Sequence, residues 1–181
     1  METERQLLDA ILGGDNKAMR RLYDRFSGYT MAVALRYIPD REDVSDVLQD
    51  SFVKILTSIS AFDYRGEGSL KAWVARIVAN RAIDWVKEHE RITMISDVPE
   101  EMIDDGVPDL EPVPPDILEK MIGRLPTGCR MVLNLYVFEQ LSHRDIAQRL
   151  GIKEDSSASQ FFHAKKLLKE MITDYLNSQK R

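Results

Sequence analysis

Residues 62–91 read FDYRGEGSLKAWVARIVANRAIDWVKEHER, and this stretch indicates the class of fold. A polar loop with two glycines precedes a long segment without proline, and Ser69 is a suitable N-cap where that segment begins. Apolar residues then recur at helical spacing, which predicts an amphipathic helix rather than a strand. They are Leu70, Trp73, Val74, Ile77, Val78 and Val86.

The same stretch carries the side-chain types that single-stranded nucleic acid requires. Aromatic residues at and beside the loop can stack on bases, and basic residues on the helix can neutralise phosphates. A flipped base needs a pocket near such a loop. An alternative assigns the tryptophans to the core and the basic residues to a solvated face. The core interpretation is favoured for Trp73 and Trp85, whereas both interpretations stand equally for Arg76, Asn80 and Arg81.

Helical periodicity continues on both sides of this stretch, and no segment alternates apolar and polar residues between hairpin turns. Asp15 can cap the second predicted helix, and Pro39 ends it. The fold class is therefore expected to be all-α, with two small helical domains. The predicted helices span residues 7–12, 15–38, about 41–60, 69 to at least 86, 117–122, 127–138, 142–150 and about 154–176.

An acidic, proline-rich segment separates the two helical halves. Residues 96–116 read SDVPEEMIDDGVPDLEPVPPD, with eight acidic residues, no basic residue and five of the seven prolines of the chain. Proline blocks helix formation and like charges repel, so an extended linker is expected. The predicted domains are residues 1–95 and 117–181, and each can bury a modest core.

Composition excludes several classes of protein. One cysteine cannot form an internal disulfide, and no Cys/His cluster has the spacing of a zinc site. No apolar run approaches a membrane span, and the N-terminus lacks the apolar stretch of a signal peptide. The histidines are scattered, Cys129 has no CxxC context, and the GEGS sequence lacks the lysine of a P-loop. We expect an intracellular protein that is not an enzyme, with no metal, cofactor or small-molecule substrate.

Residues 141–171, LSHRDIAQRLGIKEDSSASQFFHAKKLLKEM, have the pattern of a helix-turn-helix. Ser142 with Asp145 predicts a capped first helix, Gly151 a tight turn, and Ala147 a close helix crossing. The second helix opens with small polar residues that suit base edges, and lysines that suit phosphates follow. The pattern favours DNA binding over an ordinary helical hairpin with a solvated face.

Three motifs then occur in a fixed order: DREDVSDVLQDSFVKIL at 40–56, GEGSLKAWVARIVANRAIDWVK at 66–87, and LPTGCRMVLNLYVFEQLSHRDIAQRLGI at 125–152. In these the chain resembles an extracytoplasmic-function (ECF) sigma factor, the compact two-domain branch of the bacterial sigma-70 family. The resemblance covers about residues 15–92 as region 2 and 115–175 as region 4. It implies a protein that binds core RNA polymerase, recognises the −10 and −35 promoter elements, melts DNA and starts transcription without ATP.

The resemblance also implies roles for residues of the N-terminal half. The helix at 40–56 resembles the one that docks on the β′ clamp helices of the polymerase, although an acid-rich face is usually only solvated. Its candidate polymerase contacts are Asp43, Asp46, Gln49 and Asp50. The loop at 62–69 resembles the one that captures an unstacked −10 base. Candidate −10 DNA contacts are Phe62, Tyr64, Arg65, Gly66, Lys71, Arg76, Asn80 and Arg81.

The second helix of the helix-turn-helix resembles the one that reads the −35 element. Its candidate contacts are Ser156, Ala158, Ser159, Gln160, Phe162, His163 and Lys166, with Phe161 expected in the core. The chain departs from the family at Ala158 and His163, where many members carry basic residues, and at Ser157, where an aliphatic residue is usual. These departures predict a weaker phosphate contribution to −35 binding.

The implied partners are core RNA polymerase, through its β′ clamp helices and β flap, promoter DNA, and an anti-sigma factor. The implied location is the bacterial cytoplasm, including a state held at the membrane by the anti-sigma factor. Residues 96–116 either occupy the RNA exit path by resembling RNA in charge or act as a plain tether. A helix-turn-helix regulator with a palindromic site and a helical interaction protein without DNA binding remain alternatives. The GEGSLKAW loop favours the sigma factor, because a repressor has no use for a base-trapping loop.

Overall fold

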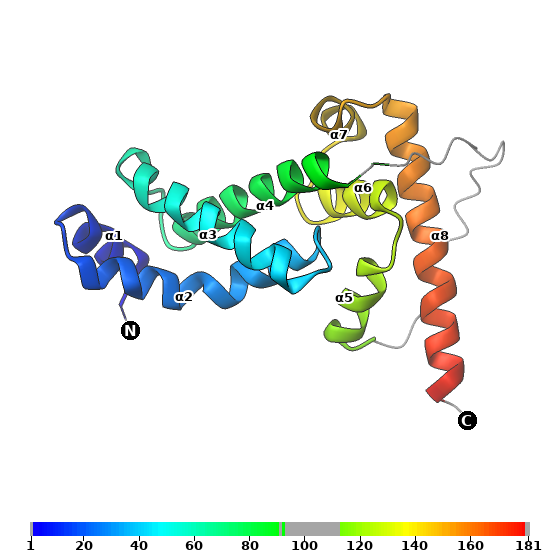
Figure 1. Ribbon diagram of the computed structural model, residues 1–181, viewed down its shortest axis with the longest axis horizontal. Coiled ribbons are helices and arrows are strands. Elements are labelled where there is room, and N and C mark those ends of the chain that lie inside the picture. The colour runs from blue at the N-terminus through cyan, green and yellow to red at the C-terminus, as the bar shows by residue number, and fades with distance from the viewer. Residues whose placement is uncertain (1, 91, 93–112, 180–181) are drawn as a thin grey trace. The chain divides into compact units, whose positions relative to one another are not determined.

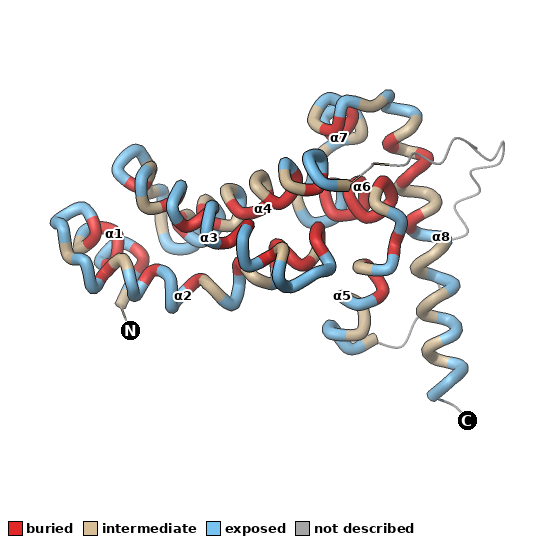
Figure 2. The backbone as a smooth tube through the Cα atoms, viewed as in Figure 1, coloured by how far each residue is buried: buried red, intermediate tan, exposed pale blue. Residues whose placement is uncertain are grey.

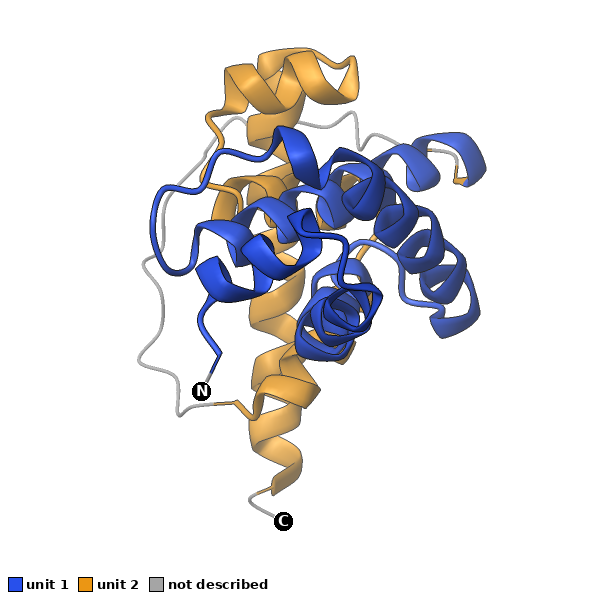
Figure 3. Ribbon diagram, turned by 90° about the vertical axis from the view of Figure 1, so that its left-hand side faces the viewer, with its two compact units in different colours: residues 1–89 blue, residues 90–181 orange. Residues whose placement is uncertain are grey.

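The computed structural model describes residues 2–90, 92 and 113–179. The chain divides into two compact units, Met1–His89 and Glu90–Arg181 (Figure 3). All regular structure in the described residues is helical, which confirms the predicted all-α class. Most of the predicted linker, residues 96–112, lies outside the described residues. Its last two residues, Pro115 and Asp116, already belong to the next helix.

The first unit consists of four α-helices and one short 3₁₀ turn (Figure 1). The long helices begin and end close to the predicted positions, and α2 ends at Leu35, before Pro39. The elements are α1 (Glu4–Leu12), α2 (Asn16–Leu35), α3 (Arg41–Ser58), η1 (Ile59–Ala61) and α4 (Ser69–His89).

Local capping explains where three of these helices begin. Thr3 and Gln6 form a capping box at α1. Asp15 accepts from the Lys17 amide at α2, as predicted. Asp40 accepts from the first amides of α3. Each cap satisfies amide groups that the first helical turn leaves without a partner inside the helix.

The start of α4 departs from the prediction that Ser69 is its N-cap. The Ser69 hydroxyl instead donates to the Gly66 carbonyl at 2.6 Å and accepts from the Arg65 amide at 3.2 Å, within the preceding loop. The carboxylate of Glu4 takes the capping position. A local capping rule could not predict this contact, because Glu4 lies more than sixty positions before the start of α4.

Helices α2, α3 and α4 pack against one another around the core of the first unit, and Figure 2 shows their buried faces in red. Leu22 of α2, Ile55 of α3 and Val78 of α4 are fully buried. Trp73 and Trp85 are only half-buried, so each lies at the edge of this core. The buried apolar residues of each helix therefore face this core, and the polar faces remain outside.

The second unit contains α5 (Pro115–Gly123), α6 (Thr127–Val137), α7 (His143–Leu150) and α8 (Glu154–Gln179). Ser142 caps α7 by accepting from the Asp145 amide at 3.2 Å. Gly151 ends α7 with φ 69°, a left-handed conformation that glycine adopts without strain. These features confirm the predicted helix-turn-helix.

The core of the second unit forms where α5, α6 and α8 meet. Its buried residues include Ile122 of α5, Cys129 of α6 and Ala164 of α8. Phe161 packs against this cluster, as expected of a core residue. Leu167, Leu168 and Met171 also pack against it, so apolar contacts hold the middle of α8 on the core of this unit.

Candidate nucleic-acid interface

The loop that links η1 to α4 has a backbone shape that requires glycine. Gly66 has φ 121° and Gly68 has φ 90°, and side-chain-bearing residues rarely adopt such values. Phe62, at the start of the loop, packs on Trp73 with ring centroids 5.0 Å apart. The loop thus places one aromatic ring against the edge of the core and leaves Arg65 exposed.

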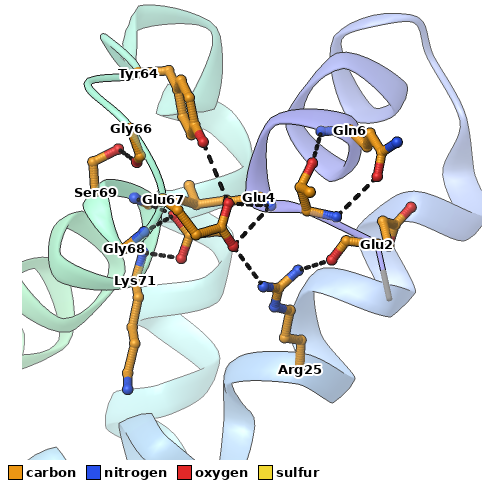
Figure 4. A network of polar contacts seen from close by, with 12 residues as sticks. Glu2, Glu4, Gln6, Arg25, Tyr64, Gly66, Glu67, Gly68, Ser69 and Lys71 are labelled. Carbon is orange, nitrogen blue, oxygen red and sulfur yellow. Dashed lines mark hydrogen bonds and ion pairs between the residues drawn. The ribbon is translucent and has the colours of Figure 1, made fainter.

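The Glu67 carboxylate, inside the loop, accepts hydrogen bonds from three different residues (Figure 4). Glu67 accepts from the Glu4 amide at 3.1 Å, from Arg25 at 3.2 Å and from the Tyr64 hydroxyl at 3.4 Å. Partial desolvation, followed by the negative charge of Glu67, raises the pKa of Tyr64. The Tyr64 hydroxyl is therefore a neutral donor at physiological pH, and its ring is held beside the loop.

The exposed side of α4 offers basic and polar side chains next to the loop. Lys71 is exposed, and its ammonium lies 4.3 Å from the centroid of the Tyr29 ring. Arg76 is exposed and makes no ion pair within the described part of the chain. Asn80 is half-buried, one helical turn beyond Arg76, on the same side of the helix. The sequence did not point to Tyr29, because nothing near it in the chain suggests a binding role.

Arg81 behaves differently from the other basic residues of α4. Its guanidinium lies 3.1 Å from Asp50 of α3 and 3.3 Å from Glu88, and the side chain is only 30% exposed. Two carboxylates therefore offset its charge locally. The structure thus brings together Asp50, predicted to contact polymerase, and Arg81, predicted to contact DNA.

The predicted polymerase contacts lie on the outer side of α3. Asp46, Gln49 and Asp50 are exposed, and Asp43 is half-buried. The first three line a shallow depression of about 350 Å³, which Arg81 and Trp85 complete. The surface is polar and acidic, so it suits a basic partner surface rather than an apolar one.

The structure divides the predicted −35 contacts into two groups. Ser156, Ala158, Phe162 and His163 are half-buried, and Lys166 is exposed, so all five reach the surface of α8. Ser159 and Gln160 are buried, at 2% and 0% exposure. Gln160 accepts from the Cys129 thiol at 3.3 Å inside the unit. Their assignment as DNA contacts is therefore corrected, because both belong to the side of α8 that faces the core.

A contact that the sequence did not reveal joins the two helices of the helix-turn-helix. His143 of α7 lies 2.9 Å from the Ser157 hydroxyl at the start of α8 and stacks on Tyr136 with centroids 4.7 Å apart. Desolvation lowers the pKa of His143, and the negative charge of Glu154 opposes this effect. Ser157 is thus part of a polar link that joins α7 to the start of α8.

The described residues offer little for other kinds of site. No group of three or more His, Cys, Asp or Glu side chains among them is arranged to hold a metal ion. No helix in this part of the chain is both long and apolar enough to cross a bilayer. Burial raises the pKa of the Cys129 thiol to about 11, so that thiol is protonated and unreactive at neutral pH.

Comparisons with known proteins agree with this arrangement. The family models Sigma-70 region 2 and Sigma-70, region 4 match residues 22–92 and 116–168. The ECF RNA polymerase sigma-E factor of Haemophilus influenzae is 27% identical over 94% of this chain and 95% of its own length. The RNA polymerase sigma-H factor of Pseudomonas aeruginosa is 26% identical over 97% of this chain and 96% of its own length. These relatives are sigma factors, which are not enzymes.

A solved structure has a similar fold. It is the structure of CnrH in complex with the cytosolic domain of CnrY, with a TM-score of 0.50, 23% sequence identity, and coverage of 96% of this chain and 99% of that chain. At this identity the likeness concerns the fold alone. It agrees with the helical architecture of the described residues.

Proposed function

We propose that each of the two units binds a different promoter element, because the chain belongs to the sigma-70 family, as an ECF sigma factor that directs promoter recognition and transcription initiation by RNA polymerase. The first unit takes the melted −10 element, and the second unit takes the −35 duplex. The observation that carries this proposal is the first unit itself. Its glycine loop lies at the start of a helix with exposed basic side chains, and the acidic side of α3 belongs to the same unit.

The −10 element is bound by the loop and the exposed side of α4. A base that leaves the stack enters beside Phe62, Tyr64 and Gly66, where the aromatic rings are already held in place. Lys71 and Arg76 neutralise the phosphates of the melted strand. Arg65 and Asn80 supply further polar contacts. Arg81 contributes less, because Asp50 and Glu88 offset its charge.

The polymerase is bound by the outer side of α3. Asp43, Asp46, Gln49 and Asp50 face the β′ clamp helices, and their acidic character calls for basic groups on that partner. Arg81 is paired with Asp50, so a polymerase contact at Asp50 also changes the surroundings of a DNA-binding candidate. The free chain has a net charge of −5 and binds promoter DNA weakly.

The −35 duplex is bound by the surface residues of α8. Ser156, Ala158 and Phe162 face the bases, and His163 and Lys166 face phosphates. The β flap holds this unit on the polymerase. With both units held at a fixed separation, two weak DNA contacts reinforce each other through effective concentration, and preferential binding to the open form drives melting.

We further propose that the chain has no catalytic activity of its own and works in the bacterial cytoplasm. An anti-sigma factor covers its DNA- and polymerase-binding surfaces until a signal releases it, and an anchored partner would hold it at the membrane. CnrH, a protein of similar fold, has been solved in complex with the cytosolic domain of CnrY.

Reconstituted transcription tests the proposed function. Bacterial core RNA polymerase is given a genomic promoter library with and without this chain, and the start sites are sequenced. We expect discrete new start sites that share two upstream elements. If the chain neither binds core polymerase nor adds start sites, a free-standing helix-turn-helix regulator becomes the better description, and a search for a palindromic site follows.

A further inference from the structure

Helix α1 contributes a buried carboxylate to the start of α4. Glu4 is only 3% exposed, although it is the first residue of its own helix. One carboxylate oxygen accepts from the Gly68 amide at 2.9 Å and the Leu70 amide at 3.0 Å, and the other accepts from the Lys71 amide at 3.2 Å. A buried carboxylate is costly unless hydrogen bonds compensate it, and the three amides with the positive end of the helix dipole supply that compensation.

The same residue is tied to the loop a second time, through its main chain. The Glu4 amide donates to both carboxylate oxygens of Glu67, at 3.3 and 3.1 Å. Arg25 of α2 donates to Glu67 and to the Glu2 carbonyl, and so joins the loop to the residues that precede α1. Figure 4 shows these contacts converging on the turn between Gly66 and Lys71.

This arrangement has two consequences for the loop. An anion normally binds well at a helix N-terminus, but here Glu4 already occupies the first amides of α4. A DNA phosphate must therefore be met by side chains such as Lys71 rather than by the helix end. In addition, Gly66 and Gly68 leave the loop backbone free to adopt many conformations, and the Glu4 contacts limit that freedom.

We propose that Glu4 is a positioning residue for −10 recognition: its carboxylate holds the start of α4 and the 62–69 loop in the shape that presents Phe62 and Tyr64 to an unstacked base. This inference rests on the proposed function of the loop. Residue 4 lies before the stretch matched by the region 2 model, which begins at residue 22. Glu4 itself does not touch DNA.

The test compares Glu4→Gln with Asp24→Asn in holoenzyme assembled from core polymerase and the full chain. The glutamine keeps the size of the side chain but replaces one accepting oxygen with a donor group that opposes the amides. Asp24 is an exposed residue of α2, outside the network, and its variant removes the same charge. The probes are a single-stranded −10 oligonucleotide with a fluorescent base at the captured position and a duplex carrying only the −35 element.

For Glu4→Gln we expect about fivefold to tenfold weaker binding of the −10 strand, in line with the loss of a helix cap, and a smaller fluorescence change on base capture. Affinity for the −35 duplex and for core polymerase should stay within twofold of wild type. Asp24→Asn should match wild type throughout. Glu67→Gln, at an exposed residue, is a second variant that avoids a buried change, and a smaller loss in the same direction is expected.

Three outcomes would overturn the inference or its premise, and they are distinguishable. Unchanged −10 binding by both Glu4→Gln and Glu67→Gln would show that the network does not position the loop. An equal loss of −10, −35 and polymerase binding together with a lowered melting temperature would reduce Glu4 to a purely structural role. Failure of the wild-type holoenzyme to capture the base would count against the proposed function of the loop itself.

Discussion

The −10 loop of the first unit and the helix-turn-helix of the second unit are both candidate DNA-binding sites, but they are held in place in different ways. The loop gets its shape from glycine backbone conformations and from carboxylates of distant residues such as Glu4. The recognition helix gets its position from a local cap, a glycine turn and an apolar core. The proposed capture of a flipped base therefore depends on contacts between distant residues, whereas the proposed reading of duplex depends on local capping and core packing.

The largest expected effect is on the stability of the second unit, which contains the helix-turn-helix. Gln160→Ala leaves a cavity and removes the acceptor of the Cys129 thiol, so the free energy of unfolding of the second unit should fall by about 2 kcal/mol. Urea unfolding followed by circular dichroism measures this change. Lys166→Ala is the matched control on the exposed side: it should weaken binding of −35 duplex and leave stability unchanged. Intact stability in Gln160→Ala would place Gln160 back among the surface residues.

The next largest expected effect is on capture of the −10 base, and it tests the backbone conformation of the 62–69 loop. Gly68 has φ 90°, where a side chain introduces strain of about 1–2 kcal/mol, although nothing lies within 4 Å of an added Cβ. Gly68→Ala should therefore weaken capture of the −10 base without affecting −35 binding. Gly28→Ala, in the middle of α2 with open space around it, is the control and should not reduce either affinity. Equal −10 binding by Gly68→Ala would mean that the loop does not depend on this conformation.

A smaller effect separates two arginines of α4. Arg76→Ala should reduce affinity for single-stranded −10 DNA about fivefold to tenfold and lower the dependence of binding on salt, because an exposed charge is lost. Arg81→Ala should reduce it only about twofold, because Asp50 and Glu88 already offset the charge of Arg81. Salt titrations of both variants with the same oligonucleotide make the comparison. The reverse order would show that the ion pairs of Arg81 open when DNA binds.

The smallest effect concerns the polar link inside the helix-turn-helix. Because the pKa of His143 is lowered below 6.5 in the folded unit, the unfolded chain binds more protons there. The stability supplied by neutral His143 is therefore fully present above pH 6.5 and declines as the pH falls from 6.5 towards the folded pKa. Thermal unfolding between about pH 5 and 7.5 should show this slope, and His143→Phe should lack it. An unchanged slope in the variant would assign the pH dependence to groups other than His143.

Much of the candidate site could be predicted because its residue types and spacing are local signals. The basic residues on the exposed side of α4 and the glycine loop before it were visible in one stretch of sequence. The side of α8 that faces the core was harder to predict, because residues 156–160 are mostly polar and include no large apolar side chain that would distinguish inside from outside. That is why Ser159 and Gln160 were predicted to contact DNA, although both side chains are buried in the structure.

The amino-acid sequence by itself determined the helices, their caps at Asp15 and Ser142, and the turn at Gly151, because these depend on interactions between residues at most a few positions apart. Only the tertiary structure decided that Glu4 caps α4, that Asp50 pairs with Arg81, and that His143 reaches Ser157. These contacts join residues 66, 31 and 14 positions apart, and they form only once the apolar faces of the helices have packed.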